Sequence, residues 1–314
     1  MYDKVKLYVD RGIVGDSFSA IPGYLDPTTV KSVYDYHTRQ ERITGNLDGL
    51  RLSVNVGGVY IEGSFAKFFY GDNLHTHTRA TTEEVIQKLS DLLHADIGES
   101  RVMSLEFGTN FPMRYEVVRY LSLLGNLNHM QQSNFAGSIY YTPKGKEAYQ
   151  RICFYDKGAE ATGKGVVLPA GLGNNLLRYE MRLNGRLNRQ LKCGQVYGST
   201  LYDEAFYKQV GDMWRSRYFS IEKKRQIKND VMNKKMTVGE AFNLLMAQLI
   251  GQGDGRVVET FINELKANKA LSHPKDYTAL KKKIREVCSS VKTTETDELI
   301  KELDDDIKSA GAYL

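Results

Sequence analysis

Residues 151–157, RICFYDK, and residues 177–183, LRYEMRL, are two strand-like runs that carry charge where a buried strand should carry none. The first run ends in an acid and a base, and the second places a carboxylate, Glu180, between two arginines. Ionised groups on a sheet are costly unless they are paired, bind a metal or take part in chemistry. Three tyrosines, Tyr197, Tyr202 and Tyr207, follow these runs. Acid, base and nearby phenols together suggest phosphodiester chemistry by a tyrosine nucleophile.

The composition indicates a folded and mildly basic protein. The chain has 314 residues, of which 41% are hydrophobic, so disorder is not expected. Its 43 Lys and Arg residues against 38 Asp and Glu residues give a net charge of +5, which fits a nucleic-acid binder as well as many ordinary enzymes. The 20 tyrosines stand out more, because tyrosine stacks on bases and donates hydrogen bonds to phosphates.

The cysteines and the apolar runs bear on location. The three cysteines, Cys153, Cys193 and Cys288, are scattered without metal-binding spacing, which favours a reducing cytoplasm. The first ten residues have a strand pattern rather than the apolar core of a signal peptide. No apolar run approaches the roughly 20 residues that span a bilayer. We expect a soluble protein in the cytoplasm of a bacterial host.

The chain changes character near residue 200, from mixed strand and helix to mainly helix. Gly57-Gly58 indicates a hairpin turn, Thr81 with Glu84 a helix-capping box, and Pro112 the start of a helix to about Leu124. The alternation of apolar residues predicts strands at 5–9, 50–56, 59–70, 101–111, 135–141, 149–157 and 177–183. Helices are expected at 223–235, 257–269, 275–291 and 295–309, with a second capping box at Thr237 and Glu240.

The first 200 residues have two loosely matching halves. Residues 68–72, FFYGD, resemble residues 153–157, CFYDK, and residues 104–106, SLE, resemble residues 178–180, RYE. One interpretation is an internal duplication of a hairpin–helix–strand unit, and the other is chance similarity between short segments.

Two carboxylates, Glu106 and Glu180, are each expected in the middle of a strand. If those strands are neighbours, both carboxylates project from one face of the sheet. Oxygen ligands of this kind suit Mg²⁺ or Mn²⁺, which would polarise a scissile phosphate. The alternative is a strand stabilised by salt bridges to nearby arginines.

Two further groups are candidates for the same site. Lys157 can stabilise developing negative charge, and Asp156 can bind the metal or orient the lysine, although such a pair is also common at a strand end. His75 and His77, one residue apart, can share a metal ion if they lie on a strand. The preceding residues 71–73, GDN, favour a loop, so His77 is either a metal ligand or an exposed or phosphate-contacting residue.

A tyrosine nucleophile needs a phenol on a mobile segment near the metal. Tyr197 lies between two glycines just beyond the strand of Glu180, and is the first candidate. Tyr202 and Tyr207 are the competitors. Basic residues at Lys223, Lys224 and Arg225 can bind DNA phosphates or form a solvated helix face.

Several of these segments, in this order, resemble the phage and plasmid replication initiators of the filamentous-phage gene II type, which are related to rolling-circle plasmid initiators. The matching segments are residues 3–9 (DKVKLYV), 62–68 (EGSFAKF) with 71–73, 102–111, 154–157 (FYDK) and 177–180 (LRYE), so the resemblance covers roughly residues 1–200.

The resemblance implies a strand-specific nick at a DNA origin, single-stranded or in a hairpin, with a 5′-phosphotyrosine link, a free 3′-OH primer and later strand closure. It also implies Mg²⁺ or Mn²⁺, DNA contacts at Lys67 and Arg178, and host helicase and polymerase as partners. One departure is that the first mid-strand acid is usually Asp in this family, whereas here it is Glu106.

The sequence therefore predicts an α+β protein. Residues 1–200 would form an antiparallel sheet with flanking helices, an HUH- or Rep-like nicking domain, and residues 201–314 a helical region for DNA contact or for a homodimer. Two alternatives are a relaxase or transposon-type nickase, and a non-catalytic origin-binding protein that recruits a helicase.

Overall fold

The computed structural model describes residues 1–36, 39–145, 149–169, 172–173, 175–224, 235–252, 257–290 and 298–310. The chain divides into two compact units. The first contains Met1–Val117, His129–Tyr218 and Asp306–Leu314, and the second contains Val118–Asn128 and Phe219–Asp305.

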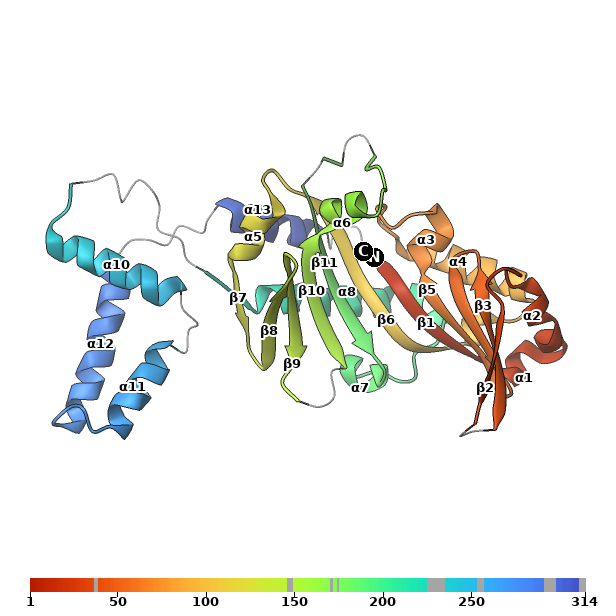
Figure 1. The fold of residues 1–314 in the computed structure, drawn as a ribbon, viewed down its shortest axis with the longest axis horizontal. Helices are drawn as coiled ribbons and strands as arrows, with labels where there is room; N and C mark the ends of the chain where they lie inside the picture. The colour runs from red at the N-terminus through yellow and green to blue at the C-terminus, as the bar shows by residue number, and fades with distance from the viewer. Residues whose placement is uncertain are drawn as a thin grey trace. The chain divides into compact units, whose positions relative to one another are not determined.

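The first unit is built on a 10-stranded sheet in which neighbouring strands are antiparallel (Figure 1). Two long strands, β1 (Tyr2–Asp10) and β6 (Arg101–Pro112), lie at its centre. On the side of β1 follow β5 (Gly58–Ser64), β4 (Leu50–Asn55), β3 (Gln40–Leu47) and β2 (Lys31–Asp35). On the side of β6 follow β11 (Leu176–Asn184), β10 (Gln150–Asp156), β9 (Ser138–Pro143) and β8 (Met130–Phe135).

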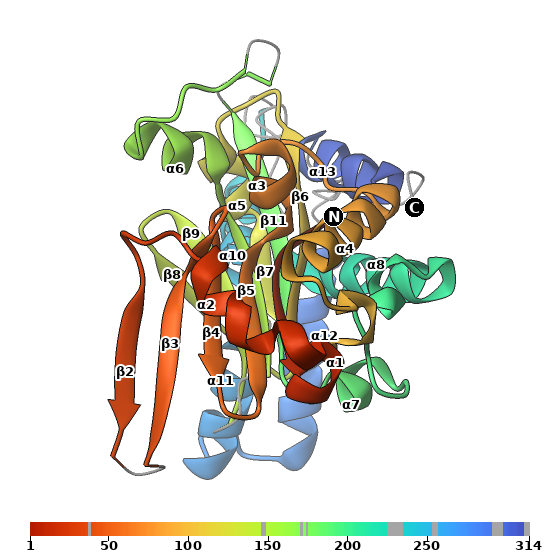
Figure 2. The same cartoon turned by 90° about the vertical axis from the view of Figure 1, so that its right-hand side faces the viewer.

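Helices cover one face of this sheet. Figures 1 and 2 show α4 (Arg79–Leu93) and α8 (Glu204–Phe219) on the same side of it. The shorter helices of this unit are α1 (Arg11–Val14), η1 (Gly15–Ala20), α2 (Ile21–Tyr24), α3 (Phe65–Tyr70), η2 (Ile97–Glu99), α6 (Lys157–Gly163), α7 (Leu187–Leu191) and η3 (Ser199–Tyr202).

The covered face of the sheet carries an aromatic core. Successive side chains of a strand point to opposite faces, so Tyr179 and its neighbours two residues away point toward α8. The Tyr179 ring stacks on Phe154 at 4.4 Å and on Trp214 at 4.6 Å, and its hydroxyl donates to the Trp214 carbonyl at 2.7 Å. All three side chains are buried. This packing fixes which residues of β11 point to the other, polar face.

The second unit holds most of the helical part of the chain. It contains a short antiparallel pair, β7 (Leu124–Leu127) with β12 (Ile221–Lys223). Its helices are α10 (Val238–Gln252), α11 (Val257–Ala267) and α12 (Pro274–Ser290), and the unit shares α5 (Val117–Ser122) and α13 (Glu298–Ser309) with the boundary of the first unit. Among the described residues, no helix is both long and apolar enough to cross a membrane.

The predicted fold class is confirmed, since the chain forms an antiparallel sheet with flanking helices followed by helices. The connectivity of hairpin, helix and strand occurs twice, in β4–β5 to β6 and in β9–β10 to β11, with β1 inserted between β5 and β6. Whether this reflects a duplication stays a prediction. The capping box at Thr237 and Glu240 is confirmed by hydrogen bonds in both directions.

Three local predictions were wrong. Pro112 ends β6 instead of opening a helix, because the strand continues to pair with Leu176 there. The helix α4 is capped by Thr78, which exchanges hydrogen bonds with Thr81, one turn earlier than expected. Lys223 lies on β12 and not on a helix, because its strand pairs with β7. Most of the expected basic helix, including Arg225, lies outside the described residues.

His77 is part of the core beside α4, and no strand carries it. Its ring is buried and lies near the rings of Phe65, Phe69 and Tyr70, while Nδ1 is 3.2 Å from the Thr81 hydroxyl. Burial lowers the pKa of His77 to about 3. The folded protein therefore holds a neutral ring that the unfolded chain protonates below its ordinary pKa of about 6.5.

Replacing Gly108 by alanine should disturb the centre of the sheet. A Cβ there would lie 2.4 Å from the Tyr179 carbonyl oxygen and 3.0 Å from the Glu180 Cα, and neither backbone atom can move aside. We expect Gly108→Ala to lower the free energy of unfolding by about 1–3 kcal/mol in urea denaturation. Gly163→Ala is the control, because it meets nothing within 4 Å and lies in a helix. Equal stability of the two variants would contradict the prediction.

His77 should make the protein sensitive to acid. Stability is present above pH 6.5 and is lost as the pH falls toward 3, because only the unfolded chain then binds the proton. The loss can reach about 1.4 kcal/mol per pH unit for one proton. In urea denaturation between pH 7 and 4.5, His77→Phe should flatten this dependence by up to one proton, whereas His75→Gln, at an exposed histidine, should not. A parallel pH dependence of wild type and His77→Phe would refute it.

Candidate functional site

A buried guanidinium, that of Arg178 on β11, holds three strands together on the polar face of the sheet. Its Nη2 lies 2.5 Å from Asp3 Oδ2 on β1, its Nη1 donates to Asn110 Oδ1 on β6 at 2.9 Å, and its Nε donates to Glu180 Oε1. Asp3 also accepts hydrogen bonds from Ser64 and from Asn73, the latter at 3.1 Å. The side chains of Arg178, Asp3 and Glu180 are all buried, so each charge depends on these partners.

A second guanidinium, that of Arg182, joins the two expected carboxylates. Its Nη2 donates to Glu180 Oε2 at 2.7 Å. Its Nε lies 2.6 Å from Glu106 Oε2 as an ion pair, without the angle of a hydrogen bond. Glu106 and Arg182 are directly opposite each other on β6 and β11. The expected adjacency of the two strands is therefore confirmed, and the salt-bridged arrangement foreseen as the alternative is present.

A β-bulge brings the third carboxylate, Asp3, into this cluster. The register of β1 against β6 shifts between Tyr2 and Val5, opposite Glu106. Such an insertion turns a side chain that strict alternation would send to the other face. Oxygens of Asp3, Glu106 and Glu180 thus lie within 4.8 Å of one another. Sequence reasoning missed Asp3, because a bulge in a strand leaves no mark in the alternation of residues.

The charges of the cluster are strongly coupled. Burial acts to raise the pKa of Glu180, but Arg178 and Arg182 outweigh burial and lower it to about 2. Burial and the nearby Glu180 raise the pKa of Glu106 to about 8, against the opposing effect of Arg182. Glu180 is thus an anion at neutral pH, whereas Glu106 holds a proton unless another cation joins the cluster.

Three carboxylate oxygens at this separation form a donor set that suits a hard divalent cation. The raised pKa of Glu106 supports this fit, because a cation would replace the proton that the buried carboxyl otherwise holds. Arg178 and Arg182 already bind several of the same oxygens, so a cation would share them. Among the described residues, this is the group of acids, histidines and cysteines that could hold a metal ion.

Tyr155 on β10 reaches the same cluster. Its hydroxyl donates to Glu180 Oε1 at 2.9 Å, and it lies opposite Arg178 in the register of β10 and β11. Burial and the charge of Glu180 raise the pKa of Tyr155, so the phenol is protonated at rest. This was the tyrosine within the opening motif that sequence reasoning set aside in favour of residues beyond the strands.

The two residues after Tyr155 have local partners. Asp156 caps α6, where its Oδ1 accepts from the Ala159 backbone at 2.8 Å, and it is not part of the carboxylate cluster. Lys157 is buried, with its Nζ 2.6 Å from Glu160 Oε2. The negative charge of Glu160 also contributes to the raised pKa of Tyr155, which places Glu160 near the phenol.

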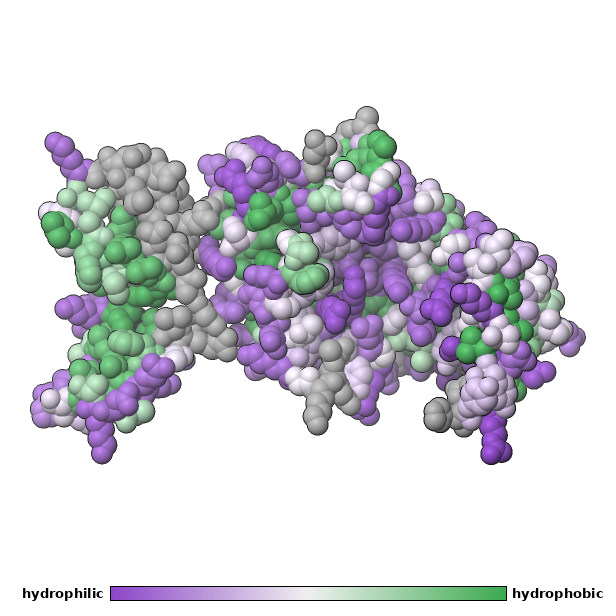
Figure 3. Space-filling model, in the orientation of Figure 1, coloured by the Kyte–Doolittle hydropathy of each residue, from purple (hydrophilic) through white to green (hydrophobic). Residues whose placement is uncertain are grey.

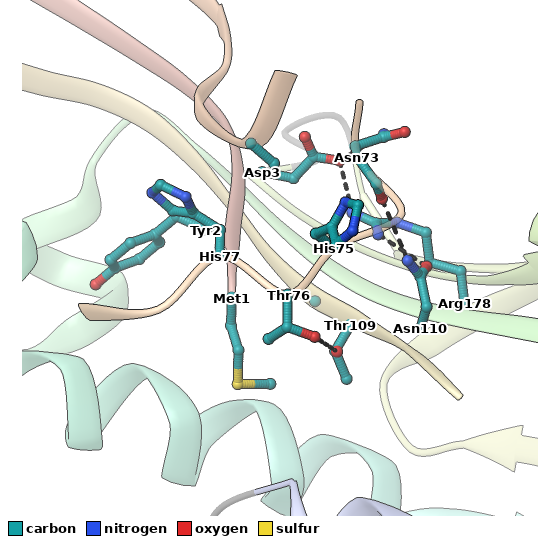
Figure 4. A pocket seen from close by; sticks show the side chains of 12 residues that line it. Met1, Tyr2, Asp3, Asn73, His75, Thr76, His77, Thr109, Asn110 and Arg178 are labelled. Carbon is teal, nitrogen blue, oxygen red and sulfur yellow. Dashed lines mark hydrogen bonds and ion pairs between the residues drawn. The ribbon is translucent and has the colours of Figure 1, made fainter. Parts of the chain in front are cut away.

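A small cavity of about 10 Å³ adjoins Asp3 and Arg178, with room for about one water molecule (Figure 4). Asn73, Asn110 and Thr109 line it together with both expected histidines. His75 is exposed and its Nδ1 is 3.0 Å from Asp72, while the His77 ring is packed in the core. His77 is therefore not brought into the carboxylate cluster.

The other expected tyrosines lie elsewhere in the first unit. Tyr197 is 39% exposed and its backbone bridges Arg101, at the opposite end of β6 from Pro112. Five residues of strand separate Arg101 from Glu106, about 17 Å along β6. Tyr202 lies on η3, with its carbonyl bound by Arg79, and Tyr207 is buried, with its hydroxyl donating to the His77 carbonyl at 3.4 Å.

The expected DNA contacts differ in their surroundings. Lys67 is exposed on α3, whereas Arg178 is committed to the buried cluster. In the second unit, Lys223 donates to the Ile221 carbonyl at 3.0 Å, and burial lowers its pKa to about 8. Lys224 is half-buried, and Arg225 lies outside the described residues.

Comparisons with known proteins agree with the resemblance noted in the sequence. The family model Phage_CRI, which describes the N-terminal part of a replication-associated protein, matches residues 39–211, more than half of the chain, and this stretch contains Glu106, Tyr155 and Glu180. No curated protein matches the chain. One similar solved structure is titled "Structure of Rolling Circle Replication Initiator Protein from Geobacillus stearothermophilus", with 10% identity and a TM-score of 0.40 over 73% of this chain and 87% of that one. The chain belongs to this family of replication-associated proteins, the rolling-circle initiators of phages and plasmids.

Proposed function

We propose that this protein starts rolling-circle replication by cutting one strand of its origin DNA, with Tyr155 as the nucleophile. Proteins of this family are generally site-specific endonucleases, and origin binding is implied by membership. The single observation that carries the residue assignment is the hydrogen bond of 2.9 Å from the Tyr155 hydroxyl to Glu180. It puts a phenol in contact with the carboxylate cluster, as attack on a phosphate held there requires.

In this proposal the chemistry is a simple exchange of ester bonds. The Tyr155 oxygen forms a bond to the phosphorus, the bond from phosphorus to the 3′ oxygen breaks, and the freed 3′ oxygen takes up a proton. The phenol proton passes to a base, for which Glu180 Oε1 is an acceptor already in contact. The 5′-phosphotyrosine link keeps the energy of the phosphodiester bond, so the reverse reaction can rejoin the strand.

Asp3, Glu106 and Glu180 are the residues that would hold a divalent cation, with Mg²⁺ or Mn²⁺ as the proposed ions. When bound, such an ion would supply positive charge to the scissile phosphate. Arg182, which is part exposed, and Lys157 are further cations near the phenol that can oppose developing negative charge. Asp156 and His77, expected as ligands from the sequence, have other partners and are not included.

The remaining expectations from the sequence stay proposals. Tyr197 and Tyr202 are alternative nucleophiles, which would require movement of their segments to the cluster. Host helicase and polymerase are expected partners, and the helical second unit is expected to contact DNA or to form a homodimer. A relaxase, a transposon-type nickase or a non-catalytic binding protein are outcomes that the following experiments distinguish.

Tyr155→Phe should abolish covalent attachment to DNA. Single-stranded oligonucleotides tiled across the replicon that encodes the protein would be labelled at the 3′ end and incubated with the protein and Mn²⁺. The wild type should form an adduct stable to denaturation, and peptide mass mapping should find it on Tyr155. Tyr197→Phe and Tyr202→Phe are the matched controls and should keep the adduct. An adduct that survives in Tyr155→Phe would refute the assignment, and none with the wild type would favour the binding protein.

Removal of the metal or of one ligand should act on both activity and stability. EDTA should stop adduct formation, and Mn²⁺ at ten times its dissociation constant should stabilise the wild type by about 1.4 kcal/mol. Glu106→Gln, which keeps the shape of the side chain, should lose most of this thermal shift. Glu99→Gln, at an exposed acid on η2, should retain it. Equal shifts in wild type and Glu106→Gln would show that the cluster is not the metal site.

A further inference from the structure

The polar face of the sheet continues beyond the carboxylate cluster as a row of side chains that crosses five strands. Paired positions link Arg51 on β4 to Glu62 on β5, Glu62 to Lys6 on β1, Lys6 to Ser104 on β6, and Ser104 to Asn184 on β11. Directly paired residues point to the same face of a sheet. This row therefore shares its face with Glu106, which is two residues from Ser104 on β6.

A cleft of about 750 Å³ lies over this row. We call it the β1–β5 cleft, and it is lined by Lys6, Arg42, Arg51, Ser53, Tyr60, Glu62, Met103, Ser104, Asn184 and Gly185. Figure 3 shows hydrophilic residues gathered over the middle of the sheet on the face toward the viewer. Its volume is in the range of a binding site rather than of a packing defect.

The lining of the β1–β5 cleft is basic. Three cationic side chains face one acid, Glu62, which is itself 2.8 Å from Lys4 and 3.6 Å from Lys6. Within the part of the chain that the structure describes, no ion pair joins Arg42 or Arg51 to an acid. Both arginines are exposed. Cations without a protein partner in a cleft form a site for an anionic ligand.

The cleft also offers neutral groups that suit a nucleic acid. The Ser53 hydroxyl is buried without a hydrogen-bond partner among the described residues, so it is able to donate to a ligand oxygen. The Tyr60 ring lies 4.7 Å from Tyr8 and 5.4 Å from the Lys6 ammonium, which makes a tyrosine surface within a basic groove. Basic grooves with aromatic side chains are typical of proteins that bind single strands.

We infer that the β1–β5 cleft binds the sugar–phosphate backbone of the DNA strand on one side of the cut. This inference rests on the proposed function, since it takes the scissile phosphate to lie at the carboxylate cluster. Ser104 is two residues from Glu106, and Lys6 three from Asp3, about 7–10 Å along their strands. At about 3.4 Å per nucleotide, the cleft begins about two to three nucleotides from the cut.

The first test measures binding of the full-length protein to a fluorescent single-stranded origin oligonucleotide without divalent ions. The double variant Arg42→Gln, Arg51→Gln should bind at least 10-fold more weakly at 0.1 M salt. The slope of log K against log salt should fall by about 1.4, since each contact with a single strand contributes about 0.7. Lys208→Gln removes one charge from α8, on the covered face, and should change neither value. Unchanged affinity and slope in the double variant would overturn the inference.

The second test assigns the cleft to one side of the cut. Oligonucleotides are shortened one nucleotide at a time from each end, and the loss caused by the double variant is measured for each length. The loss should disappear when one flank is cut to about two to three nucleotides, and should persist when the other flank is shortened. A loss that persists at every length, or disappears from both sides alike, would overturn the inference.

The two proposals can fail independently. If the wild type forms no covalent adduct but the arginine effect depends on one flank, the nuclease assignment fails and the cleft stands as a DNA site. If the adduct forms on Tyr155 and the double variant binds like the wild type, the cleft assignment fails and the nuclease stands.

Discussion

The buried guanidinium of Arg178 is the constraint on which the polar face depends. It contacts Asp3, Asn110 and Glu180, which come from three neighbouring strands and from both ends of the sheet-forming sequence. A buried charge of this kind is stable only with all its partners, and removal of one partner costs about 3–5 kcal/mol. The central strands can therefore keep this register while they hold several acids close together, which would otherwise repel one another.

The two faces of the central strands have separate tasks that one backbone imposes. On β11, Tyr179 points into the aromatic core, and Arg178 and Glu180 point to the polar face. Gly108 lets β6 approach β11 where Glu180 lies opposite, since a side chain there would meet the backbone of β11. The position of the Glu180 carboxylate is thus set from behind by core packing and from the side by a close approach of strands.

The fold class and half of the cluster could be predicted from the sequence, because charged residues within apolar alternation leave a clear signal. Glu106 and Glu180 were found in this way. Asp3 could not be found, since the bulge that turns it follows from how β1 pairs with β6. Tyr155 was read as part of a strand, and a mobile phenol was sought beyond it at Tyr197. The pairing of β10 with β11 supplies the contact that sequence spacing does not reveal.

The charge of the cluster indicates what it is built to receive. With all groups ionised, three carboxylates and two guanidinium groups leave one negative charge, and the raised pKa of Glu106 reflects a proton that cancels it. A divalent cation together with one phosphodiester brings one net positive charge, which matches the deficit without a proton. Neither partner alone does so. The cluster therefore favours the cation and the DNA phosphate as a pair, and Tyr155, bonded to Glu180, lies where that pair would assemble.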